Sequence, residues 1–409
     1  MERTSCPYVL DPTGRDIHTE GAELAERGAA TLVELPGEVV AWSVNTQEAL
    51  RRLLSDSRVS KNPRMHWLRY INGEITEDWP MHLWVSVQNM FTAYGADHRR
   101  LRSLVSKAFT PRRVAAMRPR IEQITARLLD TMDAASSSGQ PVDLREGYAY
   151  PVPIEVICEL FDVPGSLRPG LREVVDGVFD TTLTAEQAQA NVVRLYQIMH
   201  ELVATKRENP GDDLASGLIA VREEDGSHLE EAELVDTLIL VISAGHETTV
   251  NLLDQAVTAL LTHPEQLELV RSGTSSWADV VEETLRWQAP VAYLPLRYAV
   301  EDIELDNDVT IRRGDAILAA YAASGRDRSV FGDTADSFDI TRPDKTHLAF
   351  GHGVHYCLGA PLARMEAEIA LPALFDRFPG LKLAMAPEEL EPSHSFISNG
   401  HVTLPVNLR

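Results

Sequence analysis

The apolar positions of the chain define one helix that is much longer than the others. Leu, Val and Ile recur through residues 229–263, Ser227 and Glu230 form a capping box just before them, and Pro264 follows them. At ~1.5 Å per residue this helix spans about 50 Å. We therefore expect it to cross the whole molecule.

The remaining patterns predict shorter helices and a few strands. The expected elements are a hairpin over 31–35 and 39–44 around a Pro36-Gly37 turn, a short helix over 46–54, mostly helical structure over 112–225, short strands over 302–319 with turns at Asn307 and Gly314, and a helix over 360–375. Residues 62–92 are rich in Trp, Met, Pro and Asn and are expected to form a long irregular segment, which inside a compact domain is usually functional.

Composition narrows the class of protein. The 409 residues are 44% hydrophobic and 24% charged, as in a globular chain with a large core, and the formal net charge of −23 argues against nucleic-acid binding. Three cysteines cannot build a disulfide framework, which favours a reducing compartment. The N-terminal segment lacks an apolar signal core, and no apolar run is long enough to span a membrane. We expect a cytoplasmic protein without a membrane anchor.

The middle of the long helix is unusual. It reads Ala244-Gly245-His246-Glu247-Thr248-Thr249, and a glycine inside a helix costs about 1 kcal/mol. The Thr248 hydroxyl can bond the carbonyl of Ala244 and open the helix locally. Taken alone, the segment is either a polar kink in a buried helix or a place where small residues make room for a ligand beside an acid and an alcohol.

A single cysteine lies in a glycine-rich loop, Phe350-Gly351-His352-Gly353-Val354-His355-Tyr356-Cys357-Leu358-Gly359, directly before a helical run. Backbone N–H groups and the helix dipole can stabilise a thiolate there, and a thiolate is an electron-rich metal ligand. A lone cysteine is more often a small buried hydrophobe. A zinc cluster with His352 and His355 is a second alternative, although structural zinc normally takes four ligands and no further cluster appears.

The sign of the charge reverses over residues 98–120, which carry eight Lys or Arg and no acid. Such a run is commonly a solvated helix face. Here His98 and Arg102 lie four residues apart on one helical face, where they can bind carboxylates together. The remaining bases, among them Arg99, Arg112 and Arg113, could form a docking patch for an acidic partner.

The cysteine loop resembles the haem-binding loop of the cytochrome P450 family in the spacing of Phe350, Gly353, His355, Cys357 and Gly359. The resemblance implies that the cofactor is haem b. It implies that Cys357 is the axial ligand of the haem iron, with Phe350 packed beside the sulfur.

Three further segments resemble the family's motifs and stand in the family's order. The resemblance implies that His98, Arg102, Arg297 and His355 bind the haem propionates. It implies that Ala244 and Gly245 make room for O₂ and substrate, while Glu247 and Thr248 deliver protons. Glu283 and Arg286 resemble the family's buried Glu–Arg pair. Ser337 stands where the family often has an arginine that completes the pair, which leaves Arg342 and Arg326 as candidates for the third partner.

The resemblance covers nearly the whole chain. It implies a mainly α fold with small β-sheets, a long central helix over the haem and the cysteine loop beneath it, in one domain over residues 1–409. Leu294, Pro295, Phe396 and Ile397 would face the substrate. The implied activity is monooxygenation of a lipophilic small molecule, such as a steroid, a macrolide or another polycyclic compound. The monooxygenation would use O₂ and two electrons, which a ferredoxin and its NAD(P)H-dependent reductase would supply. The alternatives are a haem-thiolate enzyme of oxidative coupling or peroxygenation, and a non-enzymatic haem carrier or sensor.

Overall fold

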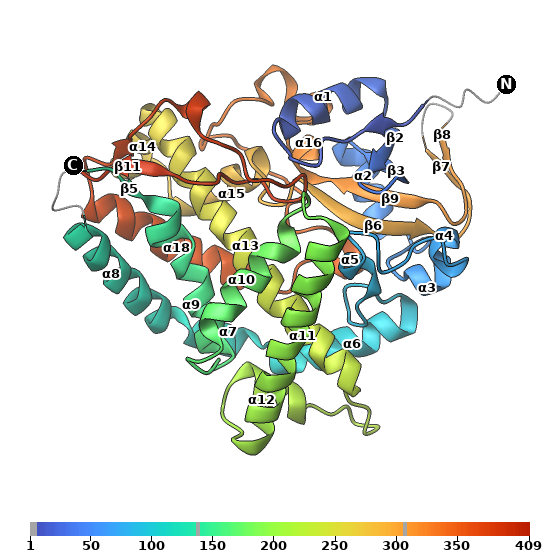
Figure 1. Ribbon diagram of the computed structural model, residues 1–409. Coiled ribbons are helices and arrows are strands. Elements are labelled where there is room, and N and C mark those ends of the chain that lie inside the picture. The colour runs from blue at the N-terminus through green and yellow to red at the C-terminus, as the bar shows by residue number, and fades with distance from the viewer. Residues whose placement is uncertain (1–5, 136–139, 306–308) are drawn as a thin grey trace.

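The computed structural model describes residues 6–135, 140–305 and 309–409 (Figure 1). In its first half the helices are α1 (Ile17–Arg27), α2 (Gln47–Ser55), α3 (Pro63–His66), α4 (Leu68–Ile71), α5 (Leu83–Ser86), α6 (Gly95–Ala108), α7 (Pro111–Ala116), α8 (Arg118–Ala135), the π-helix η2 (Arg145–Ala149), α9 (Pro151–Leu160), α10 (Arg168–Phe179) and α11 (Ala185–Glu208). In the second half they are α12 (Leu214–Ala220), α13 (Glu231–Thr262), α14 (Pro264–Arg271), α15 (Trp277–Trp287), α16 (Tyr321–Gly325), α17 (Arg328–Phe331), the 3₁₀ turns η3 (Gly332–Thr334), η4 (Gly353–His355) and η5 (Pro387–Glu389), and α18 (Ala360–Arg377).

The strands form three small sheets. Their bounds are β1 (Tyr8–Val9), β2 (Ala30–Leu35), β3 (Val39–Val44), β4 (Val59–Ser60), β5 (Val142–Asp143), β6 (Tyr293–Ala299), β7 (Ile303–Leu305), β8 (Val309–Ile311), β9 (Ala316–Ala320), β10 (Lys382–Leu383) and β11 (Pro405–Asn407). The largest sheet has the order β1-β2-β3-β9-β6-β4 and brings the N-terminal hairpin beside strands from the last third of the chain. The other sheets are β10-β11-β5 and the pair β7-β8.

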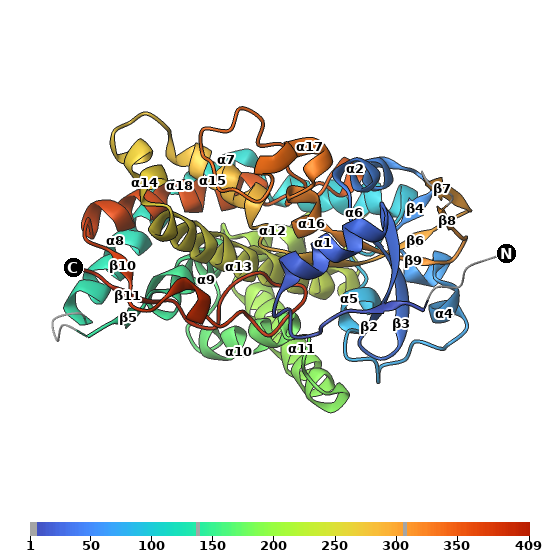
Figure 2. The ribbon, with the colours of Figure 1, turned by 90° about the horizontal axis from the view of Figure 1, so that it is seen from above.

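Helix α13 is the axis of the molecule. Its 32 residues extend over about 48 Å at ~1.5 Å per residue, and Figure 2 shows it running through the helical part towards the sheet. It is buried over most of its length because apolar side chains lie on all of its faces, against α9, α11, α15 and α18. The sheet side of the molecule has two further apolar clusters of its own.

The sequence predicted most of these elements. The hairpin β2–β3 and the long helix are confirmed. The capping box of α13 is shifted, because the Glu230 side chain and Glu233 make it, not Ser227 and Glu230. The supposedly irregular segment 62–92 contains α3, α4 and α5, each only four residues long. The expected turn at Asn307 lies outside the described residues.

The Glu283–Arg286 pair is buried and lies on α15, with both side chains fully inaccessible to solvent. All five guanidinium N–H groups of Arg286 are used: two bond the Glu283 carboxylate at 2.9 and 2.7 Å, and three bond the carbonyls of Gly325, Ala335 and Ser337 at 2.8, 2.9 and 2.8 Å. The pair thereby fixes the irregular segment 325–337, the meander that leads towards the cysteine loop.

Arg342 is the third partner that the sequence left open. Its Nε lies 3.4 Å from Glu283 Oε1, and its other nitrogens bond Thr334. Arg326 instead bonds the carbonyl of Trp287. Arg342, five residues beyond Ser337, therefore contacts the Glu283 carboxylate in place of an arginine at position 337.

Candidate active site

A largely apolar cavity lies between the middle of α13 and the cysteine loop. Leu83, Trp84, Val87, Met90 and Phe91 from segment 83–91 contribute to its wall, as do Val178 and Phe179 at the end of α10. Figure 1 shows α10 and α11 in front of α13, and we call these two helices the roof of the cavity. The segment 62–92, which had no regular periodicity, thus supplies much of the cavity surface.

Cys357 forms part of the opposite wall, and its side chain is open to the cavity. Its backbone N–H donates to the Phe350 carbonyl at 2.9 Å, which closes the loop. Gly353 makes this turn with φ of 69°, and a Cβ there would lie 2.5 Å from the Leu54 carbonyl oxygen. Burial raises the pKa of the thiol, while the backbone N–H groups of Gly359 and Ala360 act in the opposite direction. The loop therefore presents one sulfur to the cavity with two backbone donors behind it.

Phe350 also lines the cavity and lies beside this loop. Its ring is 6.4 Å from that of Tyr356, and the Arg364 guanidinium lies 4.6 Å from the Phe350 ring centroid. Arg364 in turn pairs with Glu282 on α15. These contacts hold the aromatic side chain in place near Cys357.

Four predicted propionate ligands come together at one end of the cavity. Arg102, Arg297 and His355 line it, and the His98 ring lies 4.1 Å from that of His355. Arg102 donates to the Tyr356 carbonyl at 2.7 Å, and Arg297 donates to the Tyr321 hydroxyl at 3.2 Å. Burial lowers the pKa of His98 to about 4 and lowers the pKa of His355 as well, so both imidazoles are neutral near pH 7.

Lys61 is a further cation of this group that sequence reasoning missed. It is 3% exposed and lines the cavity, with Nζ 3.5 Å from the Phe91 ring centroid and 3.5 Å from the Pro295 carbonyl oxygen. Burial, followed by the charge of Arg297, lowers its pKa well below the usual value. The signal in the sequence was weak, because a lone lysine after a strand is ordinarily a surface residue.

The cationic end of the cavity fits the carboxylates of a haem. Lys61, Arg102 and Arg297 form no ion pair with any described carboxylate, and Arg297 Nη1 and His98 Nε2 are buried without a hydrogen-bond partner among the described residues. Buried cations without counter-charges are costly. A flat apolar group with anionic arms, held over a cysteine sulfur, satisfies these groups together.

The middle of α13 forms the cavity wall facing the cysteine. Thr248 Oγ1 donates to the Ala244 carbonyl at 2.8 Å, as the sequence predicted. Ala244, Gly245 and Thr248 all line the cavity. A Cβ at Gly245 would lie 2.7 Å from Ile157 Cδ1, so glycine also permits the close approach of α9. This stretch combines open space with one hydroxyl group.

Glu247 does not share this cavity with Thr248. Its buried carboxylate faces a second, polar cavity on another side of α13, where Oε1 accepts bonds from Arg145, Asn251 and Ser398 at 3.2, 3.1 and 3.0 Å. The neighbouring acid and alcohol thus face two different cavities. Glu247 therefore does not line the same cavity as Thr248, because adjacent residues of a helix point about 100° apart. Its part in proton delivery stays a prediction.

Of the four predicted substrate contacts, Leu294 lines the cavity. Pro295 is buried in β6 outside the lining, with its carbonyl towards Lys61. Phe396 and Ile397 are fully buried in an apolar cluster beside the large sheet, where the Phe396 ring lies 6.3 Å from that of Tyr293. The Ile397 carbonyl accepts from Ala292 N–H at 2.7 Å, which turns this segment into the sheet-side core. The lining of the cavity does not include Pro295, Phe396 or Ile397, so their contact with the substrate stays a prediction.

Comparison with known proteins agrees with this site. The family model "Cytochrome P450" matches residues 278–400. The chain is 48% identical to 2-hydroxy-5-methyl-1-naphthoate 7-hydroxylase of Streptomyces carzinostaticus, over 99% of this chain and 98% of that one. It is similar to CYP154A1 of Streptomyces coelicolor A3(2), with 56% identity, a TM-score of 0.93, and 98% and 100% of the two chains covered. The “Testerone bound” CYP154C4 of Streptomyces sp. ATCC 11861 is 43% identical with a TM-score of 0.94, over 99% and 98% of the chains.

The chain belongs to the cytochrome P450 family and has the fold of its bacterial members. It is a haem b monooxygenase. Within the described residues no helix combines the length and apolar character that a membrane crossing needs.

Replacing Lys61 with methionine is expected to accelerate release of haem from the holoprotein by about 10-fold, since a hydrogen bond to a charged group contributes about 1.5–3 kcal/mol. Transfer of haem to excess apomyoglobin measures this rate. Lys107→Met removes an exposed lysine paired with Glu223 and should leave the rate unchanged. Equal rates in all three proteins would contradict a role for Lys61 in holding the haem.

Proposed function

We propose that the protein hydroxylates a lipophilic polycyclic small molecule, such as an aromatic polyketide, a macrolide or a steroid, in the cytoplasm. The observation that carries this proposal is the apolar cavity between Cys357 and the roof at α10, with the Thr248 hydroxyl in its wall. The similar Streptomyces protein named as a naphthoate hydroxylase supports an aromatic or polycyclic substrate.

In this proposal Cys357 would bind the haem iron through its thiolate, with the Gly359 N–H behind the sulfur. His98, Arg102, Arg297, His355 and Lys61 hold the propionates. When bound, the haem supplies the activation of O₂ with two electrons. The apolar wall excludes water and orients the substrate.

Thr248 and Glu247 move protons between solvent and this cavity. The Thr248 hydroxyl faces the cavity, and Glu247 faces the polar cavity on the other side of the helix. The Thr248 hydroxyl donates to the Ala244 carbonyl, a contact that can open a helix locally and let water pass between the two cavities. Glu247 can therefore accept a proton from the polar side and pass it, through water, to Thr248 Oγ1.

Spectral titration of the ferric protein with a panel of compounds tests the substrate class. The panel contains a hydroxynaphthoate, testosterone and a macrolactone, with camphor as a small control. We expect a low-spin to high-spin shift with at least one polycyclic compound, followed by incorporation of one ¹⁸O atom from ¹⁸O₂ during turnover with a ferredoxin system. Turnover with hydrogen peroxide but not with O₂ and ferredoxin would contradict the proposal.

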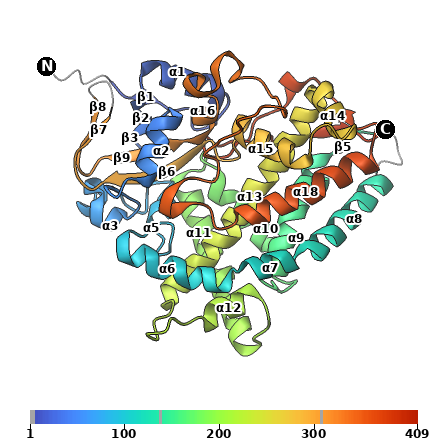
Figure 3. The ribbon, with the colours of Figure 1, turned by 180° about the vertical axis from the view of Figure 1, so that it is seen from behind.

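We further propose that the electron donor is an acidic ferredoxin that docks at α6 and α7. Arg99 and Arg112 are exposed and form no ion pair with a described residue, whereas Arg100, Lys107 and Arg113 are paired with acids. Helix α7 contacts α18, the helix that follows the cysteine loop, and Figure 3 shows α6 next to α7 on this side of the molecule. The free positive charges thus lie on the cysteine side of the molecule.

The Arg99→Glu/Arg112→Glu protein is expected to receive electrons about 10-fold more slowly at low ionic strength, because it loses electrostatic steering. Stopped-flow reduction by ferredoxin at several salt concentrations measures this, and the salt dependence should shrink. Arg377→Glu reverses an exposed charge at the far end of α18 and serves as the control. An equal slowing by Arg377→Glu would argue against a local docking site.

A further inference from the structure

The polar cavity beside Glu247 is lined by more acidic than basic side chains. It lies between α13, the end of α10, η2 and the C-terminal segment around residues 393–402. Five carboxylates line it against two guanidinium groups; the carboxylates belong to Asp143, Glu146, Asp176, Asp180 and Glu247, and the guanidinium groups to Arg145 and Arg172. Both guanidinium groups are already paired, Arg172 with Glu146 and Arg145 with Glu247 and Asp254. The cavity therefore keeps an excess of negative charge.

His246 is a buried imidazole next to Glu247 on α13, and it does not itself line the polar cavity. It is fully buried on α13, its ring lies 4.3 Å from that of Tyr150, and neither ring nitrogen makes a hydrogen bond of normal geometry with any described residue. Burial, followed by the charge of Arg145, lowers the pKa of His246 to about 3. A buried imidazole normally has a partner for its polar atoms. Here the backbone of Tyr150 lies close enough for a weak contact, and neither nitrogen has a well-formed hydrogen bond among the described residues.

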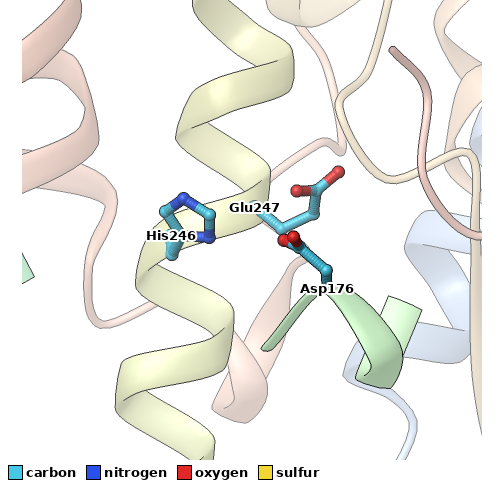
Figure 4. A group of neighbouring side chains, drawn as sticks. All are labelled: Asp176, His246 and Glu247. Atoms are coloured by element: carbon cyan, nitrogen blue, oxygen red, sulfur yellow. The ribbon is translucent and has the colours of Figure 1, made fainter. Parts of the chain in front are cut away.

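Asp176, His246 and Glu247 bring three ligand atoms within 4.8 Å of one another. Figure 4 shows Asp176 extending from α10 towards the two adjacent side chains of α13, with one ring nitrogen of His246 on the side of the Asp176 carboxylate. Among the described residues, this is the group of three that could hold a metal ion.

The two carboxylates are held by one oxygen each. Asp176 Oδ1 accepts from the Tyr150 hydroxyl at 2.8 Å, and Glu247 Oε1 accepts from Arg145, Asn251 and Ser398. No described residue donates a hydrogen bond to the second oxygen of either carboxylate. Outer partners of this kind orient the ligands of natural metal sites. One oxygen of each carboxylate thus remains for a metal.

We propose that Asp176, His246 and Glu247 form a binding site for one divalent transition-metal ion of the zinc type. An imidazole nitrogen with two carboxylate oxygens matches Zn²⁺ and its neighbours, whereas Ca²⁺ and Mg²⁺ take oxygen ligands. Ligand bonds of about 2.0–2.2 Å require the three atoms to close together by on the order of 1 Å. Water completes the coordination from the cavity.

A bound ion would connect α10, which covers the substrate cavity, to α13, which carries the proposed proton carrier Glu247. It would tie α10, whose last residues line the apolar cavity, to the centre of α13. It would also occupy Glu247, which the proposed function uses as a proton carrier. Binding itself does not depend on that function, so it is tested without turnover.

Titration of the haem-loaded protein with Zn²⁺ by isothermal calorimetry in a non-chelating buffer at pH 7.5 tests the site. We expect saturable binding of one ion per chain, and at least a 10-fold weaker affinity in Asp176→Asn and in His246→Gln. Asp176 is accessible on α10, so its variant should fold even if the His246 variant does not.

Glu146→Gln is the matched control, because Glu146 lines the same cavity but is paired with Arg172 outside the group of three. It should bind Zn²⁺ as the parent does. The same affinity in the parent and Asp176→Asn, a loss in Glu146→Gln as large as in Asp176→Asn, or no saturable binding to the parent would each overturn the proposal. An anomalous peak between the three side chains in Zn²⁺-soaked crystals would support it directly.

Discussion

Arg286→Met is expected to lower the free energy of unfolding by about 3–5 kcal/mol, because it leaves the buried Glu283 carboxylate with only the 3.4 Å contact of Arg342 in place of its two-bond partner. The change also removes five donors, so three backbone carbonyls lose their bonds and the meander before the cysteine loop loosens. Urea unfolding followed by circular dichroism measures the loss. The haem content of the purified protein should fall with it.

Arg207→Met provides the control for this substitution. Arg207 pairs with Glu231 at the surface, with about half of each side chain exposed, and such pairs contribute ~0–1 kcal/mol. If Arg286→Met lowered the free energy of unfolding by less than about 1 kcal/mol, as Arg207→Met should, the Glu283–Arg286 pair would not be needed for the stability of the fold.

Thr248→Ala is the second change with a large expected effect. It removes the hydroxyl that faces the apolar cavity and the bond to the Ala244 carbonyl. Because positioned proton transfer contributes typically 10²–10⁴-fold to rates, we expect product per electron to fall at least 10-fold while haem content is kept. Parallel measurement of NAD(P)H consumed, peroxide released and product formed gives the ratio.

Thr262→Ala is a closely matched control on the same helix. Thr262 Oγ1 donates to the Thr258 carbonyl at 2.8 Å, which repeats the geometry of Thr248, but it lies at the end of α13 outside the cavity lining. It should leave the yield per electron unchanged. A normal yield in Thr248→Ala would remove Thr248 from proton delivery.

The sequence predicted the parts of the site that depend on local rules. The Thr248–Ala244 bond follows from helix geometry, and the turn at Gly353 follows from a glycine that must take positive φ. The long helix was evident because its apolar pattern persists up to Pro264, although its capping box lies three residues later than the sequence predicted. These features need only neighbours along the chain.

Features that depend on tertiary packing could not be predicted in the same way. Lys61 becomes a cavity residue only because β4 pairs with β6 beside Arg297. Glu247 faces Arg145 across the second cavity, a partner about a hundred residues away. Phe396 was placed at the substrate by resemblance, yet the strand-like tail turns into the sheet-side cluster. The residues that neighbour Lys61, Glu247 and Phe396 along the chain do not show which cavity or cluster each side chain enters.

The difference spectrum of the reduced protein with carbon monoxide tests the central claim most directly. Thiolate ligation by Cys357 predicts the strongly red-shifted Soret band of a haem-thiolate protein, and its loss in Cys357→Ser. A spectrum typical of histidine ligation, or an unchanged thiolate band in Cys357→Ser, would contradict the account.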